Sequence, residues 1–394
     1  MSDTYREVTT RSWLGRIGSS IGGVFVGLLL LVVGVVLLFW NEGRAVQTAK
    51  SLAEGAGIVV SVPASAVDPA NEGRLVHTSG MVATGETLSD PTFGISHTGV
   101  RLVRGVEMYQ WKESAQSETK TKLGGGEETV TTYSYAREWS SSPIDSSRFK
   151  QPDGHRNPDM AIEGRRFQIG SATLGAYRLD AAVLDRIGGE QAAPVGADQI
   201  DAVRAAASVS RPVHIIDGRL LLGLDPAQPS VGDYRIAYEL AQLTQISLIA
   251  RQAGDGFAQY QTAAGDRLLM VETGNVPAEQ MFADAATGNT VLTWVLRLVG
   301  LVLLVVAFAL LLAPLGVIGD FIPLLGRVVR MGTGLVGFVG AALVGSLVIA
   351  VAWFWYRPLL SLIVIAVGVG VAALLMRFGR RRAAGGSPAP AGQA

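Results

Sequence analysis

Four long apolar runs constrain this chain more than any other feature of its sequence. Each run has about the 20 residues that an α-helix needs to cross the hydrocarbon core of a bilayer. The predicted membrane-spanning helices are residues 21–40, 293–313, 335–355 and 359–376. Only Tyr356-Arg357-Pro358 separates the last two, so these must form a tight antiparallel hairpin, since proline ends one helix and opens the next. The first run is too long for the apolar part of a usual signal peptide, so we expect it to be retained.

The composition supports a membrane protein and excludes several other classes. Hydrophobic residues make up 49% of the chain and charged residues only 17%. The net charge is +0, so no bulk attraction to nucleic acid is expected. The chain has no cysteine, which excludes disulfides and thiolate chemistry.

Arginine and lysine beside the apolar runs predict how the chain is oriented, because basic flanks stay on the cytoplasmic side. These flanks hold Arg6, Arg11, Arg16, Arg327, Arg330, Arg377, Arg380, Arg381 and Arg382, whereas the opposite flanks hold fewer. The expected cytoplasmic parts are a basic arm at residues 1–20, a loop at residues 314–334 and a basic, then disordered tail at residues 377–394. Both termini are then cytoplasmic, and residues 41–292 form an extracytoplasmic domain.

The pattern of residues 41–292 is that of a mostly antiparallel, β-rich domain. Residues 100–111 and 130–139 are the strongest predicted strands, and Gly124-Gly125-Gly126 lies in the polar tip between them. Asp217-Gly218 predicts a two-residue hairpin turn, because both residues tolerate positive φ. The fold class is therefore an α+β membrane protein with one N-terminal and three C-terminal transmembrane helices.

The tetrapeptide Asn-Glu-Gly-Arg occurs twice, at residues 41–44 and 71–74. The first copy follows the first apolar run, which makes Asn41, Glu42, Gly43 and Arg44 the predicted membrane junction. We expect the charged residues to end the span and Gly43 to let the next helix turn along the membrane surface. The second copy is predicted to be a turn that leads into the first strand of the domain.

Longer motifs resemble the transmembrane protein 43 family, also called LUMA. They are residues 39–45 (FWNEGRA), 51–55 (SLAEG), 71–77 (NEGRLVH), 88–91 (LSDP), 106–111 (VEMYQW), 133–139 (YSYAREW), 154–158 (GHRNP), 249–252 (IARQ) and 356–359 (YRPL). Residues 164–230 depart from the family pattern. The resemblance implies one span, a large lumenal domain and three clustered spans, together with self-association and membrane organisation.

The residue usage favours a bacterial member of that family, rich in alanine, glycine and arginine. The lumenal side then corresponds to the periplasm and the membrane to the bacterial inner membrane. The animal member resides in the endoplasmic reticulum and inner nuclear membrane, where it is thought to help organise the nuclear envelope with lamins and emerin. These partners are not expected in a bacterium.

Small residues recur at four-residue spacing in the apolar runs, which lets helices approach closely. They are Gly23 and Gly27 in the first run, and Gly337, Ala341 and Gly345 in the third. Packing within one chain and packing between copies both fit this pattern.

The sequence commits no residue to catalysis, and neither a metal nor a cofactor is expected. The weak candidates are His155 and Asn157 with Glu107 and Glu138 on the two long strands, since a histidine beside a carboxylate can act as an acid or base. The alternative is that residues 154–158 form a hydrogen-bonded turn and the glutamates are solvated.

We therefore expect a self-associating integral membrane protein that organises or scaffolds the membrane. Its expected partners are the lipid bilayer, further copies and other membrane proteins, and no nucleic acid. One alternative is a membrane-anchored enzyme acting on lipid or envelope substrates. A channel or transporter is the weaker alternative, because the apolar runs lack polar lining except Arg297 near one end.

Overall fold

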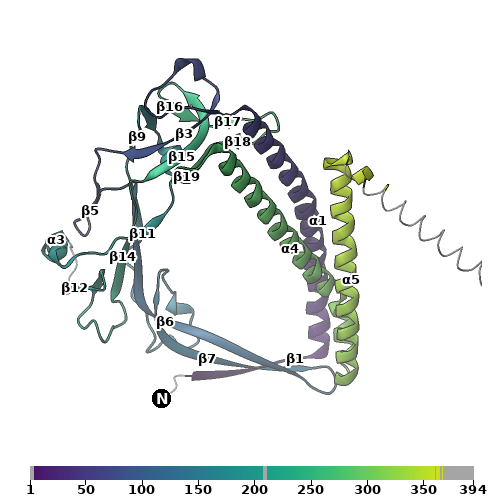
Figure 1. Cartoon of the computed structure of the whole chain (residues 1–394). Coiled ribbons are helices and arrows are strands. Elements are labelled where there is room, and N and C mark those ends of the chain that lie inside the picture. The colour runs from purple at the N-terminus through teal and green to yellow at the C-terminus, as the bar shows by residue number, and fades with distance from the viewer. Residues whose placement is uncertain (1–3, 207–210, 360, 364–365, 367–394) are drawn as a thin grey trace, which may run out of the picture. The chain divides into compact units, whose positions relative to one another are not determined.

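The computed structural model describes residues 4–206, 211–359, 361–363 and 366 (Figure 1). The chain divides into two compact units. The β unit contains the residues up to Arg11, Lys50–Lys122 and Gly126–Thr287. The helical unit contains Ser12–Ala49, Leu123–Gly125 and the residues from Gly288 onward.

Three helices in the described part of the chain are long and apolar enough to cross a membrane. They are α1 (Trp13–Ile58), α4 (Ala278–Gly319) and α5 (Pro323–Tyr356). One N-terminal and two C-terminal apolar helices are thereby confirmed, as is the mostly antiparallel β domain. The fourth predicted span, residues 359–376, lies mostly outside the described residues, and the predicted tail at 377–394 lies wholly outside them.

The small residues of the apolar runs pack α1, α4 and α5 against one another within one chain. A Cβ added to Gly27 would lie 2.9 Å from the carbonyl oxygen of Ala307, and Gly23 faces Leu310 at 3.7 Å. Gly337 lies against Phe308 of α4, at 3.4 Å from where its Cβ would be, and Gly345 against Leu304. Ala341 is 1% exposed in a core with Leu38 and Leu304. The described structure therefore assigns these positions a packing role inside the monomer.

Helix α1 continues through the first Asn-Glu-Gly-Arg tetrapeptide, so the expected break at Gly43 is absent. A Cβ at Gly43 would lie 2.7 Å from the ring of Tyr356 in α5. Because Gly43 has no side chain, the ring of Tyr356 can approach the backbone of α1 closely. Its cost within a helix, about 1 kcal/mol relative to alanine, is evidently offset by the surrounding contacts.

The larger sheet of the β unit has the strand order β1-β7-β6-β14-β13-β12, with β8 on β6 and β11 on β14. Its strands are β1 (Thr4–Arg11), β6 (Arg101–Thr121), β7 (Glu127–Ser140), β8 (Arg165–Gln168), β11 (Glu190–Ala192), β12 (Val213–Ile216), β13 (Arg219–Leu222) and β14 (Tyr234–Ala241). The long strands β6 and β7 form the predicted hairpin, visible in Figure 1. At the predicted turn between β12 and β13, Asp217 has φ 48° and Gly218 has φ 72°.

The second sheet has the order β10-β9-β3-β15-β16, and only the short β2 is parallel to its neighbour. Its strands are β2 (Val60–Ser61), β3 (Leu75–Ala83), β9 (Ala172–Leu174), β10 (Tyr177–Leu179), β15 (Gln245–Ala253), β16 (Gly256–Ala258) and β19 (Met270–Thr273). Two small pairs are β4 (Leu88–Asp90) with β5 (Ile95–His97), and β17 (Tyr260–Gln261) with β18 (Arg267–Leu268). The short helices are α2 (Ala181–Leu184), α3 (Ile200–Ala206) and the 3₁₀ turns Pro69–Asn71, Ser146–Arg148 and Ala197–Gln199.

The second copy of the tetrapeptide forms the turn that was expected before a strand. Asn71 ends a 3₁₀ turn, Gly73 has φ 76°, and β3 begins at Leu75.

The core of the β unit contains a buried polar triad, in which Arg104 and Tyr238 both bond the carboxylate of Asp90 at 2.7–2.9 Å. Burial, and then the hydrogen bond to Asp90 and the charge of that carboxylate, raise the pKa of Tyr238, so its hydroxyl stays protonated as a donor.

The N-terminal residues belong to the β unit. Residues 4–11, predicted as part of a cytoplasmic arm, form β1 and pair with β7 from Thr4↔Ser134 to Arg11↔Glu127. The sequence-based orientation put these two segments on opposite sides of the membrane. Strands that share backbone hydrogen bonds cannot be separated by a bilayer. The pairing therefore excludes opposite sides of the membrane for these two segments.

Candidate functional site: two buried polar clusters in the helical unit

The first polar cluster is built around Glu42 of α1, which is 1% exposed. Arg297 of α4 donates from Nε to Oε1 at 2.6 Å and from Nη2 to Oε2 at 2.9 Å. Trp353 of α5 donates from Nε1 to Oε2 at 2.9 Å. One carboxylate therefore joins all three helices, and its charge is matched by a bidentate guanidinium.

The neighbours of Glu42 extend this cluster toward α4. Arg44 donates to Oδ1 of Asn289 at 2.9 Å and to Oγ1 of Thr293 at 3.0 Å. Asn41 donates to the carbonyl of Thr293 at 3.0 Å, and Asn289 donates to the carbonyl of Ala45 at 3.0 Å. The predicted junction residues thus hold helices together, with Gly43 packed on Tyr356 and the three polar residues bonded to α4.

The second polar cluster lies at the α4–α5 turn, around Asp320, which is 0% exposed. Arg16 of α1 donates from Nη2 to Oδ2 of Asp320 at 2.5 Å, and Arg330 of α5 also bonds this oxygen. Arg16 donates from Nη1 to the carbonyl of Gly125 at 2.6 Å. The amide of Gly124 bonds the carbonyl of Phe321 at 3.3 Å, so the tip of the β6–β7 hairpin is part of this cluster.

An aromatic contact supports the second cluster. Trp13, the first residue of α1, donates from Nε1 to the carbonyl of Val317 at 2.9 Å, and its ring lies 5.5 Å from that of Phe321. Gly125 has φ 79°, and the indole of Trp13 occupies the space that a Cβ there would need. Gly326 likewise leaves space for the carboxylate of Asp320.

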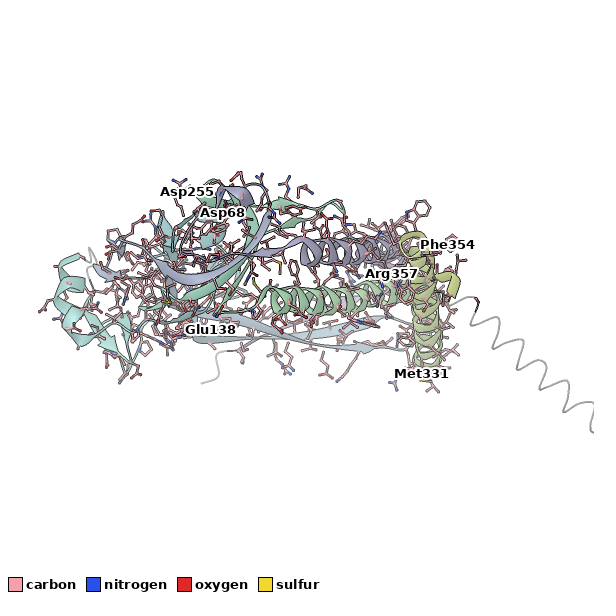
Figure 2. The ribbon with its side chains drawn as sticks, turned by 45° about the horizontal axis from the view of Figure 1, so that its top comes forward. Asp68, Glu138, Asp255, Met331, Phe354 and Arg357 are labelled. Carbon is pink, nitrogen blue, oxygen red and sulfur yellow. The ribbon has the colours of Figure 1, made fainter. Side chains whose placement is uncertain are left out.

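The two clusters therefore lie at the two ends of the helical unit. Figure 2 shows this along α5, with Met331 toward one end and Phe354 and Arg357 toward the other. Sequence reasoning missed Arg16 and Asp320 as a pair. The sequence did hold a signal for this pair, because Asp320 is the only acidic residue between 314 and 334, a segment that also contains two arginines.

The weak catalytic candidates occupy structural positions in the β unit. His155 is 4% exposed, with its ring stacked on Tyr135 at 4.1 Å and edge-on to Trp111 at 4.7 Å. Its Nδ1 lies 2.9 Å from the carbonyl oxygen of Gln151. The side chain of Asn157 bonds the backbone amide and carbonyl of Trp111 at 2.7 and 2.9 Å.

The two glutamates do not join His155. Glu138 pairs with Lys112 at 2.8 Å and lies on the face of the sheet opposite to Trp111, since Trp111 is level with Arg137. Glu107 bonds Arg235 at 2.7 Å and is four residues from Trp111 along β6, about 13 Å at the usual rise per residue. A cleft of about 360 Å³ beside Asn157 is lined by Ser146, Ser147, Pro152 and Arg156, and none of the other candidates lines it. No group of three metal-ligating side chains occurs in the described parts of the chain.

Sequence comparison identifies relatives of this chain among known proteins. No solved structure matches the chain. The sequence profile of transmembrane protein 43 matches residues 108–358, which include the hairpin tip, Arg297, Asp320 and Trp353. Mouse transmembrane protein 43 is 35% identical over 361 residues, covering 88% of each protein. The chain belongs to the transmembrane protein 43 family.

Other members of the transmembrane protein 43 family give the same result. Human transmembrane protein 43 is 34% identical over 366 residues, covering 89% of each chain. The Drosophila melanogaster transmembrane protein 43 homolog is 29% identical over 354 residues, covering 87% of this chain and 91% of its own. Family membership and the apolar helices α1, α4 and α5 together identify a membrane protein with several spans.

Proposed function

We propose that this family member is a self-associating scaffold that organises the membrane around it. The observation that carries the proposal is the free edge of strand β1. Strand β1 is the last in its sheet, and on its outer side no strand of the described chain pairs with it. Seven of its eight residues are exposed, including Val8 at 60%. Such an edge is a template for pairing with another chain.

The internal contacts of the helical unit support a structural role. Both oxygens of Glu42 are bonded, and Asp320 is held by two arginines. These clusters fix helices rather than leave a carboxylate open to a substrate. The separation of His155 from Glu138 and Glu107 favours the scaffold over the enzyme. The bacterial inner membrane, the extracytoplasmic side for most of the β unit and a fourth span at 359–376 stay predictions within this proposal.

The proposal is tested by the mass of the purified protein in mild detergent across a range of concentrations. We expect an oligomer that Val8→Lys weakens, because lysine on an edge strand opposes pairing. Ile216→Lys is the matched control, since Ile216 is 40% exposed on β12, the opposite edge of the same sheet. A monomeric mass at every concentration would refute self-association. Loss of the oligomer in Ile216→Lys but not in Val8→Lys would show that copies contact each other through the β12 edge, and would overturn the role of β1.

A further inference from the structure

A cleft of about 330 Å³ lies on one face of the larger sheet, within the β unit. Its lining residues come from strands β7, β13 and β14, from the β12–β13 turn and from the loop at residues 223–233. The other face of β13 and β14 carries Leu220 and Ile236, which are 0% exposed and belong to the main core. The cleft is therefore separate from that core, and its volume is at the lower end of the range of small-molecule sites.

Two arginines on neighbouring strands share the floor of this cleft with Leu221. In the sheet register Leu221 of β13 is level with Arg235 of β14, and Arg219 stands two residues before Leu221. The two arginines are therefore diagonal neighbours on one face of the sheet, with about 7–8 Å between their positions. Two like charges this close repel each other, and an anion bound between them removes the repulsion.

Arg235 is already oriented in the structure. Its Nε and Nη2 both lie 2.7 Å from Oε2 of Glu107. Its guanidinium also lies over the indole ring of Trp139, 4.8 Å from the ring centroid. A guanidinium has five N–H groups, so these contacts leave the donors of Nη1 unused by the residues that the structure describes. Because the side chain is held in place beforehand, little rotamer entropy is lost when a ligand binds.

Arg219 provides a positive charge that no described residue neutralises. Its side chain is exposed and forms no hydrogen bond or ion pair within the described parts of the chain, whereas Arg235 has Glu107 as its partner. Among the described lining residues only Asp217, exposed at the β12–β13 turn, is acidic. The planar fork of an arginine matches the oxygen atoms of a carboxylate or a phosphate, so these two are the anionic groups that fit.

The other lining side chains are apolar, and three of them are rings. They are those of Trp139, Ile216, Leu221, Pro226 and Pro229. Hydrogen bonds fix the loop that carries the two prolines, since the amide of Ala227 bonds Oδ1 of Asp225 at 2.9 Å and the amide of Gly232 bonds the carbonyl of Tyr109 at 2.8 Å. Proline also restricts φ, so this apolar wall keeps its shape without a ligand.

We propose that this cleft binds a small organic anion, in which a carboxylate or phosphate group is attached to a flat apolar ring. The anionic group accepts hydrogen bonds from Arg219 and from Nη1 of Arg235, and the ring packs against Trp139 and the two prolines. Binding here does not require self-association, because β1 pairs only with residues 127–134 of β7 and Trp139 lies beyond them.

Binding is tested on the full-length protein in mild detergent by fluorine NMR. The probes are fluorophenyl phosphate, fluorobenzoate and the neutral fluorobenzyl alcohol, and micelles without protein give the background. We expect saturable binding of at least one of the two anions, and the one that binds identifies the anionic group. The neutral alcohol, and inorganic phosphate used as a competitor, should bind about tenfold more weakly or worse, because each lacks one half of the interaction.

Arginine variants test the residues that hold the anion. Arg219→Gln should weaken binding about tenfold, and Arg219→Lys should restore only part of it, because lysine lacks the planar fork. Arg178→Gln is the matched control, since Arg178 is an exposed arginine of the second sheet that pairs with Asp255 at 3.3 Å. It removes the same charge from the same unit outside the cleft, and binding should stay unchanged.

The sign of the ligand charge is tested with Asp217→Asn. Asparagine also tolerates the φ of 48° at this position, so the turn is retained. Loss of the negative charge beside the two arginines should tighten binding of the anion several-fold, whereas Asp255→Asn, away from the cleft, should not. Weaker binding in Asp217→Asn would show that the cleft prefers a cation and would overturn the proposal.

The remaining outcomes are equally decisive. Absence of saturable binding of both anions above the micelle background would overturn the site, as would equal weakening by Arg219→Gln and Arg178→Gln. Competition by inorganic phosphate as strong as binding of fluorophenyl phosphate would overturn the role of the apolar wall. The scaffold is judged separately, since Arg219→Gln should keep the oligomeric mass of the native protein and Val8→Lys should keep its affinity for the anion.

Discussion

Glu42 shows how one buried residue can hold a helical unit together. Its two oxygens take bonds from Arg297 and Trp353, which reach it from two other helices. Removing one member of a buried pair leaves an uncompensated charge, which costs about 3–5 kcal/mol. The repeated tetrapeptide was recognisable in the sequence, but its partners were not, since Arg297 is 255 positions away.

We expect Glu42→Ala to lower the free energy of unfolding by about 3–5 kcal/mol, measured by thermal or denaturant unfolding in detergent. Glu138→Ala is the matched control, because the Glu138–Lys112 pair is exposed on both sides and such pairs contribute about 0–1 kcal/mol. The double variant Glu42→Gln with Arg297→Gln should recover part of the loss. Equal losses for Glu42→Ala and Glu138→Ala would contradict the role of the cluster.

Glycines in α1 provide a second test at the residue scale. Gly43 is in close contact with Tyr356, whereas nothing lies within 4 Å of a Cβ added to Gly18. Gly43→Ala should therefore destabilise the protein by about 1–3 kcal/mol through overpacking. Gly18→Ala should instead stabilise it by up to about 1 kcal/mol, because alanine favours the helix. The same sign for both variants in unfolding experiments would show that the Tyr356 contact is not formed.

At the scale of elements, the sequence predicts structures formed by neighbouring residues but not contacts between residues far apart in the chain. The β6–β7 hairpin and the Asp217-Gly218 turn follow from alternation and turn residues, and the three apolar helices follow from hydropathy. Strand β1 was missed because its eight residues hold few hydrophobic side chains, and its partner residues on β7 lie 116 to 130 positions away. The candidate site at Asp320 was missed for the same reason, since Arg16 is 304 positions away.

The docking of β1 depends on an acidic side chain at its centre. Lys150, at 3.0 Å, and the hydroxyl of Tyr133 bond Glu7, and the Lys150 bond is the main cause that lowers the pKa of Glu7 below its ordinary value of 4.5. A lowered carboxyl pKa in the folded state stabilises β1 above pH 4.5, and this contribution is lost as the pH falls through the folded-state pKa.

We therefore expect NMR titration to give Glu7 a pKa below 4.5, and Lys150→Met to return it toward that value. Protease sensitivity of the N-terminal residues should rise in acid below pH 4.5 in the native protein. Lys120→Met, which removes the exposed Lys120–Glu118 pair on the opposite face of the sheet, is the control variant and should leave the Glu7 titration unchanged. An unchanged Glu7 titration in Lys150→Met would contradict the contact.

At the scale of the whole molecule, arginine counts treated residues 41–292 as one block on one side of the membrane. Two residues inside that block, Gly124 and Gly125, bond Phe321 and Arg16 and belong to the helical unit.

The side from which the hairpin tip can be reached tests most directly whether the polar cluster around Asp320 holds that tip. Leu123, at 88% exposed, is replaced by cysteine and labelled with a membrane-impermeant thiol reagent in vesicles of known orientation. The reference is Leu324→Cys, at 72% exposed near Asp320. We expect Leu123→Cys and Leu324→Cys to react from the same side, because the hairpin tip and the α4–α5 turn are bonded to each other. Reaction of Leu123→Cys and Leu324→Cys from opposite sides would contradict this contact.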